Sequence, residues 1–232
     1  MGVAVLQLYP GQENKTGPQI IETLTRRIVN LGASQAGQFK VDCEVHQSVA
    51  GPQSGPNQQQ LAANKNLYIL HSDEHPASVF SVLECGNKTV TLTSDTLFDL
   101  LMLKLTNVYK KKTTIESKGP RFEIGDFIVK LGSVTVGGVF KGILVEVEYC
   151  PSVVPNTCWG VLQEFMQVWG YFFIFGIVHN YTFLFQGFLG SCVGSTAPQH
   201  ILNKGSETYT PVDTIHQYLQ HFNIFRKTAG VR

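Results

Sequence analysis

The sequence has little charge. Asp, Glu, Lys and Arg make up only 15% of its 232 residues, against roughly 25% in an average soluble domain, and the formal net charge is +1. A net charge this small gives no electrostatic reason to expect nucleic acid or a membrane surface as a partner. The cores of protein interfaces are depleted in charge, so the composition favours a surface that another protein covers.

Recognisable chemical motifs are also missing. The five cysteines form no C-x-x-C pair and their number is odd, which indicates neither a zinc site nor a disulfide framework. There is no Gly-rich phosphate loop, no internal repeat and no spaced set of nucleophile, histidine and carboxylate. We therefore predict no catalytic residues, no cofactor-binding residues, no metal ligands and no cofactor.

The N-terminal residues argue for a reducing compartment. The stretch MGVAVLQLYPGQENK lacks the basic region and the long apolar run of a secretory signal, and Leu6 stands where a myristoylation motif needs Ser or Thr. The expected compartment is the cytosol or the nucleus, in which sequons at Asn14, Asn87 and Asn180 stay unglycosylated.

Helical spacing of apolar residues predicts three helices. The first begins near Pro18 and ends at Gly32. The second lies in 94–112 and has three lysines at its end, where the helix dipole favours cations. The third begins at Thr210 as N-cap, with Pro211 in the first turn. Their apolar stripes are Ile21, Leu24, Ile28 and Leu31; Phe98, Leu101, Leu105 and Val108; and Val212, Ile215, Leu219 and Phe222.

The rest of the chain reads mainly as strands. Residues 39–45 alternate apolar and polar side chains, as a half-buried strand does. Further β-rich runs are 66–70, 77–84, 88–92 and at least three strands within 113–149. Residues 46–66 are rich in Gly, Pro, Gln and Ser and predict a long mobile loop. We expect an α+β fold in one domain, residues 1–232, with a large antiparallel sheet closed into a barrel-like structure and flanked by three to four helices.

One stretch does not fit this pattern. Residues 168–186, VWGYFFIFGIVHNYTFLFQ, carry no formal charge and eight aromatic side chains. They follow a predicted helix that begins at Asn156 and has an apolar face made of Trp159, Leu162, Phe165 and Met166. Without 168–186, Phe188 and Leu189 fall ten and eleven positions after Trp159, which continues that face at helical spacing.

We interpret 168–186 as a retained in-frame intron. The stretch begins with Val, whose codons start with GT, and ends with Gln, one of whose codons is CAG, and these match the two ends of an intron. Its Phe and Tyr codons are rich in T, as introns commonly are. The alternative is a membrane span, because 168–189 has about the 20 residues that a bilayer needs. His179, Asn180 and Gln186 within it, and the lack of nearby Lys or Arg, disfavour that alternative.

Three short patterns could carry chemistry. His71 and His75 are four residues apart, which suits a metal on a helix, but Pro76 and the flanking strands indicate a turn. The stretch KLTNVYKKK offers the basic and aromatic residues of a nucleic-acid binder, but it is short and fits a solvated helix end.

The third pattern is a pair of glutamates. Glu146 and Glu148 share one face of a strand and could present two carboxylates to a metal and a phosphate, with Arg121 and Lys130 as cations. A single E-x-E is weak, because any strand with one solvated face alternates in this way.

Long stretches of the sequence resemble one known family. They include MGVAVLQLYP, LTRRIVNLGASQAGQFKVDCEVHQS, LYILHSDEHPASVFSVLE, DTLFDLLMLKL, YTPVDTIHQYLQHFNIFRK and the line from Arg121 to Gln167. Together they are similar to subunit 20 of the Mediator complex of RNA polymerase II transcription, in order and over nearly the whole chain. That family runs from its counterpart of EFMQ directly into FLGS, so this sequence departs from it at 168–186.

The resemblance implies a function. It implies a non-enzymatic subunit of the Mediator coactivator, located in the nucleus, that pairs with Mediator subunit 18 and is tied to subunit 8 in the head module. It further implies a β-barrel similar to that of tunnel-type, metal-dependent RNA triphosphatases. An enzyme of that type using Glu146 and Glu148 is the alternative function, although the second E-x-E of those enzymes is missing.

Overall fold

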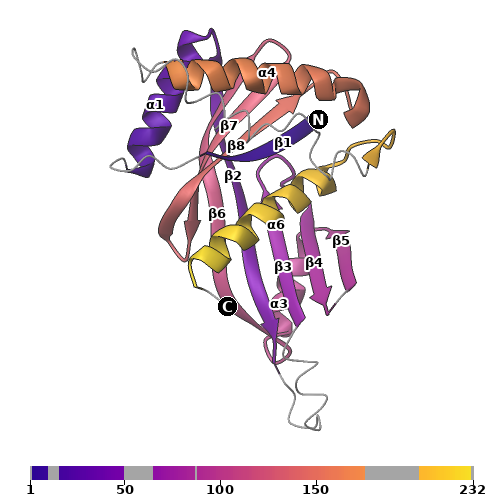
Figure 1. The fold of residues 1–232 in the computed structure, drawn as a ribbon. Helices are drawn as coiled ribbons and strands as arrows, with labels where there is room; N and C mark the ends of the chain where they lie inside the picture. The colour runs from indigo at the N-terminus through magenta and orange to yellow at the C-terminus, as the bar shows by residue number, and fades with distance from the viewer. Residues whose placement is uncertain (1, 10–15, 50–64, 87, 176–203, 231–232) are drawn as a thin grey trace. The chain divides into compact units, whose positions relative to one another are not determined.

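The chain folds around one large sheet. A computed structural model describes residues 2–9, 16–49, 65–86, 88–175 and 204–230. Its elements are β1 (Val3–Tyr9), α1 (Gly17–Asn30), β2 (Ser34–Ser48), β3 (Lys65–Ser72), β4 (Val79–Cys85), β5 (Lys88–Ser94), α3 (Leu97–Lys104), β6 (Tyr109–Ile124), β7 (Phe127–Val136), β8 (Val139–Tyr149), α4 (Pro155–Phe175) and α6 (Pro211–Thr228) (Figure 1).

The strand order is β1-β8-β7-β6-β2-β3-β4-β5. The neighbouring pairs β1–β8, β2–β3, β3–β4 and β4–β5 are antiparallel. The hairpin between β7 and β8 turns through Gly137 and Gly138, both at positive φ (56° and 82°), which a tight two-residue turn requires. These findings confirm the prediction of an α+β fold with a large antiparallel sheet and flanking helices.

The chain divides into two compact units. Unit 1 consists of Met1–Gln38, Gly119–Gly132 and Gly142–Gln217, and unit 2 consists of Phe39–Lys118, Ser133–Lys141 and Tyr218–Arg232. The prediction of one domain over residues 1–232 stays a prediction.

The core of unit 1 lies between helices and strands. Helices α1 and α4 contact each other and cover strands of this unit (Figure 1). The predicted face of the first helix is largely confirmed, because Leu24 and Ile28 are fully buried and Ile21 is partly buried. On α4, Phe165 stacks on Phe127 of β7 with the ring centroids 3.8 Å apart. Strand β1 contributes Val3, Ala4 and Val5 to the same core.

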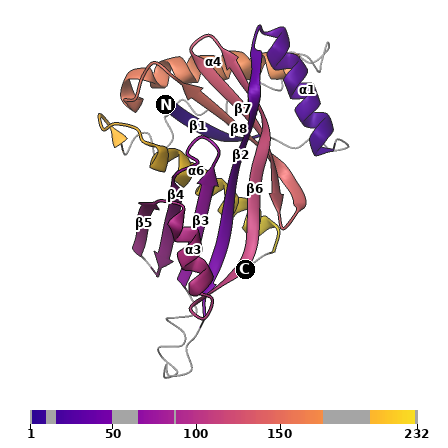
Figure 2. The same ribbon diagram turned by 180° about the vertical axis from the view of Figure 1, so that it is seen from behind.

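In unit 2 the sheet is covered on both faces. Figures 1 and 2 show α3 on one face and the C-terminal part of α6 on the other. Alternation on β2 is confirmed, because Phe39, Val41, Cys43 and Val45 are all buried. Below α3, a smaller core consists of Leu67, Ile69, Val79 and Met102. Burial raises the pKa of the Cys43 thiol well above its usual range, so this cysteine stays a neutral core residue.

The predicted second helix is only partly correct. Helix α3 spans Leu97–Lys104 and the chain then turns, so that Lys110–Lys112 belong to strand β6 and do not end a helix. The predicted stripe is half correct, because Phe98 and Leu105 pack against the core below α3, whereas Leu101 and Val108 are about half exposed. The buried residue of α3 is Met102. Helical spacing alone could not place the end of the helix, because the following residues keep the same spacing while they enter the sheet.

Two sequence interpretations fall largely outside the described residues. Of the predicted loop 46–66, residues 46–48 belong to β2 and 65–66 to β3, and 50–64 lie outside the description. Helix α4 includes Val168 to Phe175 of the suspected insert. The rest of the insert falls within 176–203, which are not among the described residues. Among the described helices, none combines the length and hydropathy of a membrane span. The interpretation of 168–186 as a retained intron stays a prediction. Sequencing of cDNA across the codons for residues 166–188 tests it, and transcripts that always carry the extra bases would refute it.

Candidate functional site

The glutamate pair lies in a buried polar cluster of unit 1. Glu146 and Glu148 are 2% and 5% exposed on β8. Lys130 of β7 is equally buried, and its Nζ lies 2.8 Å from Oε1 of Glu146. Glu148 accepts a hydrogen bond from the backbone N–H of Gly2. A Cβ at residue 2 would lie 1.8 Å from the Tyr149 carbonyl oxygen, so only glycine lets the backbone come this close.

Both carboxylates therefore have partners within the protein. The attraction between the Lys130 ammonium group and the Glu146 carboxylate offsets part of the cost of taking both groups out of water. Arg121, the other predicted cation, contacts Glu123 at 2.7 Å instead. The structure thus brings together Lys130 and Glu146 but not Arg121. This arrangement favours a structural role for the pair over presentation of two free carboxylates to a metal.

A side chain completes the outer edge of β1. Strand β1 stands at one end of the strand order, and among the described strands it pairs with β8 alone. The amide of Gln217, from α6, accepts a hydrogen bond from Leu6 N–H at 3.0 Å and donates one to the Ala4 carbonyl at 2.9 Å. The amide thus bonds these two backbone groups as a peptide of a further strand would. We call this the capped edge.

Tyr209 belongs to the same buried network. Its hydroxyl donates to the Ala4 carbonyl at 3.1 Å, accepts from Nε2 of Gln217 at 2.8 Å and lies 2.9 Å from the Thr214 hydroxyl. Burial raises the pKa of Tyr209 above its usual range, so the hydroxyl stays neutral and keeps its donor. The backbone groups at the capped edge are therefore satisfied without solvent.

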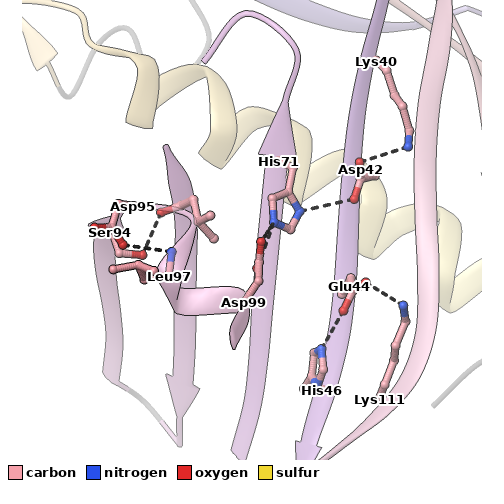
Figure 3. Close-up of polar contacts among 11 residues, drawn as sticks. Lys40, Asp42, Glu44, His46, His71, Ser94, Asp95, Leu97, Asp99 and Lys111 are labelled. Carbon is pink, nitrogen blue, oxygen red and sulfur yellow. Dashed lines mark hydrogen bonds and ion pairs between the residues drawn. The ribbon is translucent and has the colours of Figure 1, made fainter. Parts of the chain in front are cut away.

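Unit 2 has a group of partly exposed charged side chains. On the face that carries α3, His71 of β3 lies between two carboxylates (Figure 3). Its Nδ1 is 3.4 Å from Asp42 of β2 and its Nε2 is 3.1 Å from Asp99 of α3. The hydrogen bond to Asp42 and the second one to Asp99 outweigh burial and raise the pKa of His71 to about 9. At neutral pH His71 is thus a cation that ties α3 to the sheet.

The two predicted histidines have different partners. His75 lies in the turn after β3 and meets Phe80 edge-on, with ring centroids 6.0 Å apart. The turn at 73–77 confirms the interpretation that disfavoured a helical metal site. Sequence patterns did not single out Asp42 or Asp99, because only the fold brings β2, β3 and α3 together.

A second polar group lies on the same face. Glu44 of β2 accepts from Nζ of Lys111 at 2.6 Å and lies 3.0 Å from Nε2 of His46 (Figure 3). Lys111 therefore pairs across strands β2 and β6 and is not part of a free basic patch. This contact disfavours the nucleic-acid interpretation of KLTNVYKKK.

Next to these polar groups, unit 2 exposes apolar side chains. Leu97 and Leu103 of α3 are 64% and 71% exposed, and Leu92 of β5 is 52% exposed. The segment LFDLLMLKL has leucines on every side of the helix, whereas the strands below it can bury only one side. The even distribution of leucines around this helix is the sequence signal for an interaction surface.

These features define the class of protein. It is an α+β protein whose buried glutamates, Glu146 and Glu148, have partners within the protein and whose exposed apolar residues are concentrated in one unit, as in a subunit that binds other proteins.

Comparison with known proteins then gives the family. The model of the family described as TATA-binding related factor (TRF) of subunit 20 of Mediator complex matches residues 1–223. The Mediator of RNA polymerase II transcription subunit 20 of Aedes aegypti is 47% identical, covering 98% of this chain and 95% of that protein. The subunit of the same name from Homo sapiens is 37% identical and the match covers both chains completely. The chain therefore belongs to the Mediator subunit 20 family.

Among solved structures, a chain from the Schizosaccharomyces pombe Mediator head module is similar over 73% of this chain and 94% of that one. Its sequence identity is 10% and its TM-score 0.38, a distance at which the likeness says nothing about function. Family membership by sequence confirms the prediction of a transcription regulator of the Mediator complex that is not an enzyme.

Proposed function

We propose that this chain is a non-catalytic binding subunit of the Mediator head module, that it pairs with Mediator subunit 18 and is tied to subunit 8, and that it acts in the nucleus to relay regulatory signals to RNA polymerase II. The observation that carries the proposal is the family match over residues 1–223. The low charge and the exposed leucines of α3 support a role in binding other proteins.

Co-expression with subunit 18 tests the pairing. We expect the full chain to be poorly soluble alone and to co-purify with subunit 18 as one species in size-exclusion chromatography, since a partner that binds only the folded state stabilises it. A monodisperse free chain that does not associate with subunit 18 would contradict the pairing. Addition of subunit 8 to the purified pair tests the second contact, and fluorescence imaging of the tagged full chain tests nuclear location.

The triphosphatase alternative has its own assay. With Glu146 engaged by Lys130 and Glu148 by Gly2, the full chain is expected to release no phosphate from triphosphate-ended RNA in the presence of Mg²⁺ or Mn²⁺. Metal-dependent release that Glu148→Ala abolishes would overturn the non-catalytic role.

A further inference from the structure

Strand β1 has the composition of a strand that pairs readily with other chains. Its sequence, VAVLQLY, contains no charged residue and no proline, and six of its seven residues are apolar or aromatic. Short segments of high β-propensity and low charge pair with copies of themselves when their edge is exposed. Natural sheet edges are commonly protected by charge, by proline or by a covering element. Since β1 has neither charge nor proline, its protection must come from another part of the chain.

The register of β1 shows which of its backbone groups face away from β8. The two strands pair antiparallel from Val3 opposite Tyr149 to Tyr9 opposite Ile143. In an antiparallel ladder the N–H and C=O groups of alternate residues face the neighbouring strand, and those of the residues between them face outward. Because the side chain of Gln217 bonds the Ala4 carbonyl and the Leu6 N–H, the even-numbered residues of β1 are those that face outward.

Two side chains of unit 1 occupy these outward groups. Gln217 bonds the Leu6 N–H and the Ala4 carbonyl, and the Tyr209 hydroxyl donates a second hydrogen bond to the same carbonyl. Gln217 and Tyr209 are 2% and 5% exposed and bond each other at 2.8 Å. A strand added at this edge would need the same donor and acceptor, so it could pair here only after both side chains had been displaced.

The edge of β1 is complementary to itself. In an antiparallel pair of two β1 strands related by a two-fold axis at Leu6, Ala4 lies opposite Leu8 and Val3 lies opposite Tyr9. No charged residue meets another in such a pair, so no repulsion between the strands opposes it. The partner that an uncovered β1 fits is therefore β1 of a second copy of this chain.

We propose that Tyr209 and Gln217 form an intramolecular cap that prevents β1 from pairing with β1 of a second copy. The side chains that hold the start of α6 against β1 thus also keep the strand from self-association. This inference goes beyond the proposed function and does not depend on which Mediator subunit binds the chain.

The test removes the cap while keeping side chains of similar size. The double variant Tyr209→Phe/Gln217→Met lacks the hydroxyl and the amide that bond β1. Fluorescence-detected sedimentation of the full chain, from nanomolar to micromolar concentration, measures self-association. We expect the double variant to associate at a concentration at least about tenfold lower than the wild type does. As it associates, deuterium exchange should slow at the amides of Ala4, Leu6 and Leu8.

Two further variants separate edge pairing from general destabilisation. Leu24→Ala removes a fully buried side chain of α1 from the core of the same unit and leaves the cap in place, so we expect it to associate as the wild type does. Adding Leu8→Lys to the double variant places a charge on the edge of β1, at a side chain that is 43% exposed, and should restore the wild-type concentration dependence.

The possible results decide the proposal. Equal association of the wild type and the double variant would overturn it, and so would association of Leu24→Ala as strong as that of the double variant. Association that leaves exchange in β1 unchanged, or that Leu8→Lys does not reverse, would assign the contact to another surface and refute the cap. If circular dichroism shows that the double variant does not fold, Gln217→Met alone gives the same comparison, because Tyr209 still bonds the Ala4 carbonyl while the Leu6 N–H is released.

Discussion

The two units of the chain hold their charged and polar side chains in different surroundings. At the capped edge, in unit 1, the Gln217 amide bonds Leu6 N–H and the Ala4 carbonyl, and the neighbouring ion pair of Lys130 and Glu146 is buried. In unit 2, charged side chains form partly exposed pairs around His71 and Glu44 on the face that carries α3. Loss of a partner should therefore cost more in the buried contacts of unit 1 than in these pairs of unit 2.

The strongest test of this contrast is the buried ion pair. Lys130→Met leaves the Glu146 carboxylate buried without its cation, and we expect a loss of about 3 to 5 kcal/mol in the free energy of unfolding. Urea unfolding of the full chain measures it. In unit 2, Lys118→Met breaks the exposed pair with Glu116 and should cost less than about 1 kcal/mol, so equal losses would contradict the contrast.

The second test opens the capped edge. Gln217→Ala leaves the Leu6 N–H without its acceptor, whereas the Ala4 carbonyl keeps the hydrogen bond from the Tyr209 hydroxyl, so we expect about 1 to 3 kcal/mol of lost stability. Gln220→Ala, on the exposed side of the same helix, is the control and should change little. Gln217→Ala is also expected to speed deuterium exchange at Leu6. If both variants behave alike, the amide does not complete the edge.

The third test uses pH. The pKa of His71 is raised to about 9 in the folded protein, chiefly by Asp42 and then by Asp99, against about 6.5 in an unfolded chain. Its stabilising effect is therefore complete below about pH 6.5 and is lost as pH rises through about 9. Between about pH 6.5 and 9 the urea midpoint of the wild type should fall, and the fall should be smaller in His71→Gln. In this variant Lys40 still neutralises part of the charge of Asp42. In His75→Gln, whose ring contacts Phe80, the wild-type fall should persist.

The smallest effect is expected at Glu44. Lys111→Met removes an ion pair whose side chains are 48% and 31% exposed, and such pairs contribute about 0 to 1 kcal/mol. The urea midpoint should shift slightly at low salt and not at high salt. A loss comparable with that of Lys130→Met would show that the surface pairs of unit 2 are as important as the buried pair.

Sequence patterns predicted those helices and strands whose structure is determined by their own residues. Alternation at 39–45 predicted the buried face of β2. The capping residues at the start of α6 were also predicted, and Asp213 does accept from both the backbone N–H and the hydroxyl of Thr210 at 2.7 Å. The second helix was overextended, because Lys110–Lys112 pair in a sheet and no local signal indicates that pairing.

The candidate site was predictable only in part. Glu146, Glu148 and Lys130 were identified by type and spacing, but whether a carboxylate is free depends on what the fold places beside it. Gln217 was not identified, because it is an unremarkable glutamine until α6 places it at the edge of β1, more than two hundred residues away in sequence. The same holds for Asp42 of β2 and Asp99 of α3, which meet at His71 of β3.

By itself the sequence determined the alternation of its strands, the start of its helices and its membership of the Mediator subunit 20 family, because these depend on residue order and local chemistry. Tertiary structure decided which carboxylates are neutralised, which strand edge is capped and which leucines stay exposed. Those properties depend on contacts between segments distant in the chain, and a local pattern contains no information about which segment arrives as a neighbour.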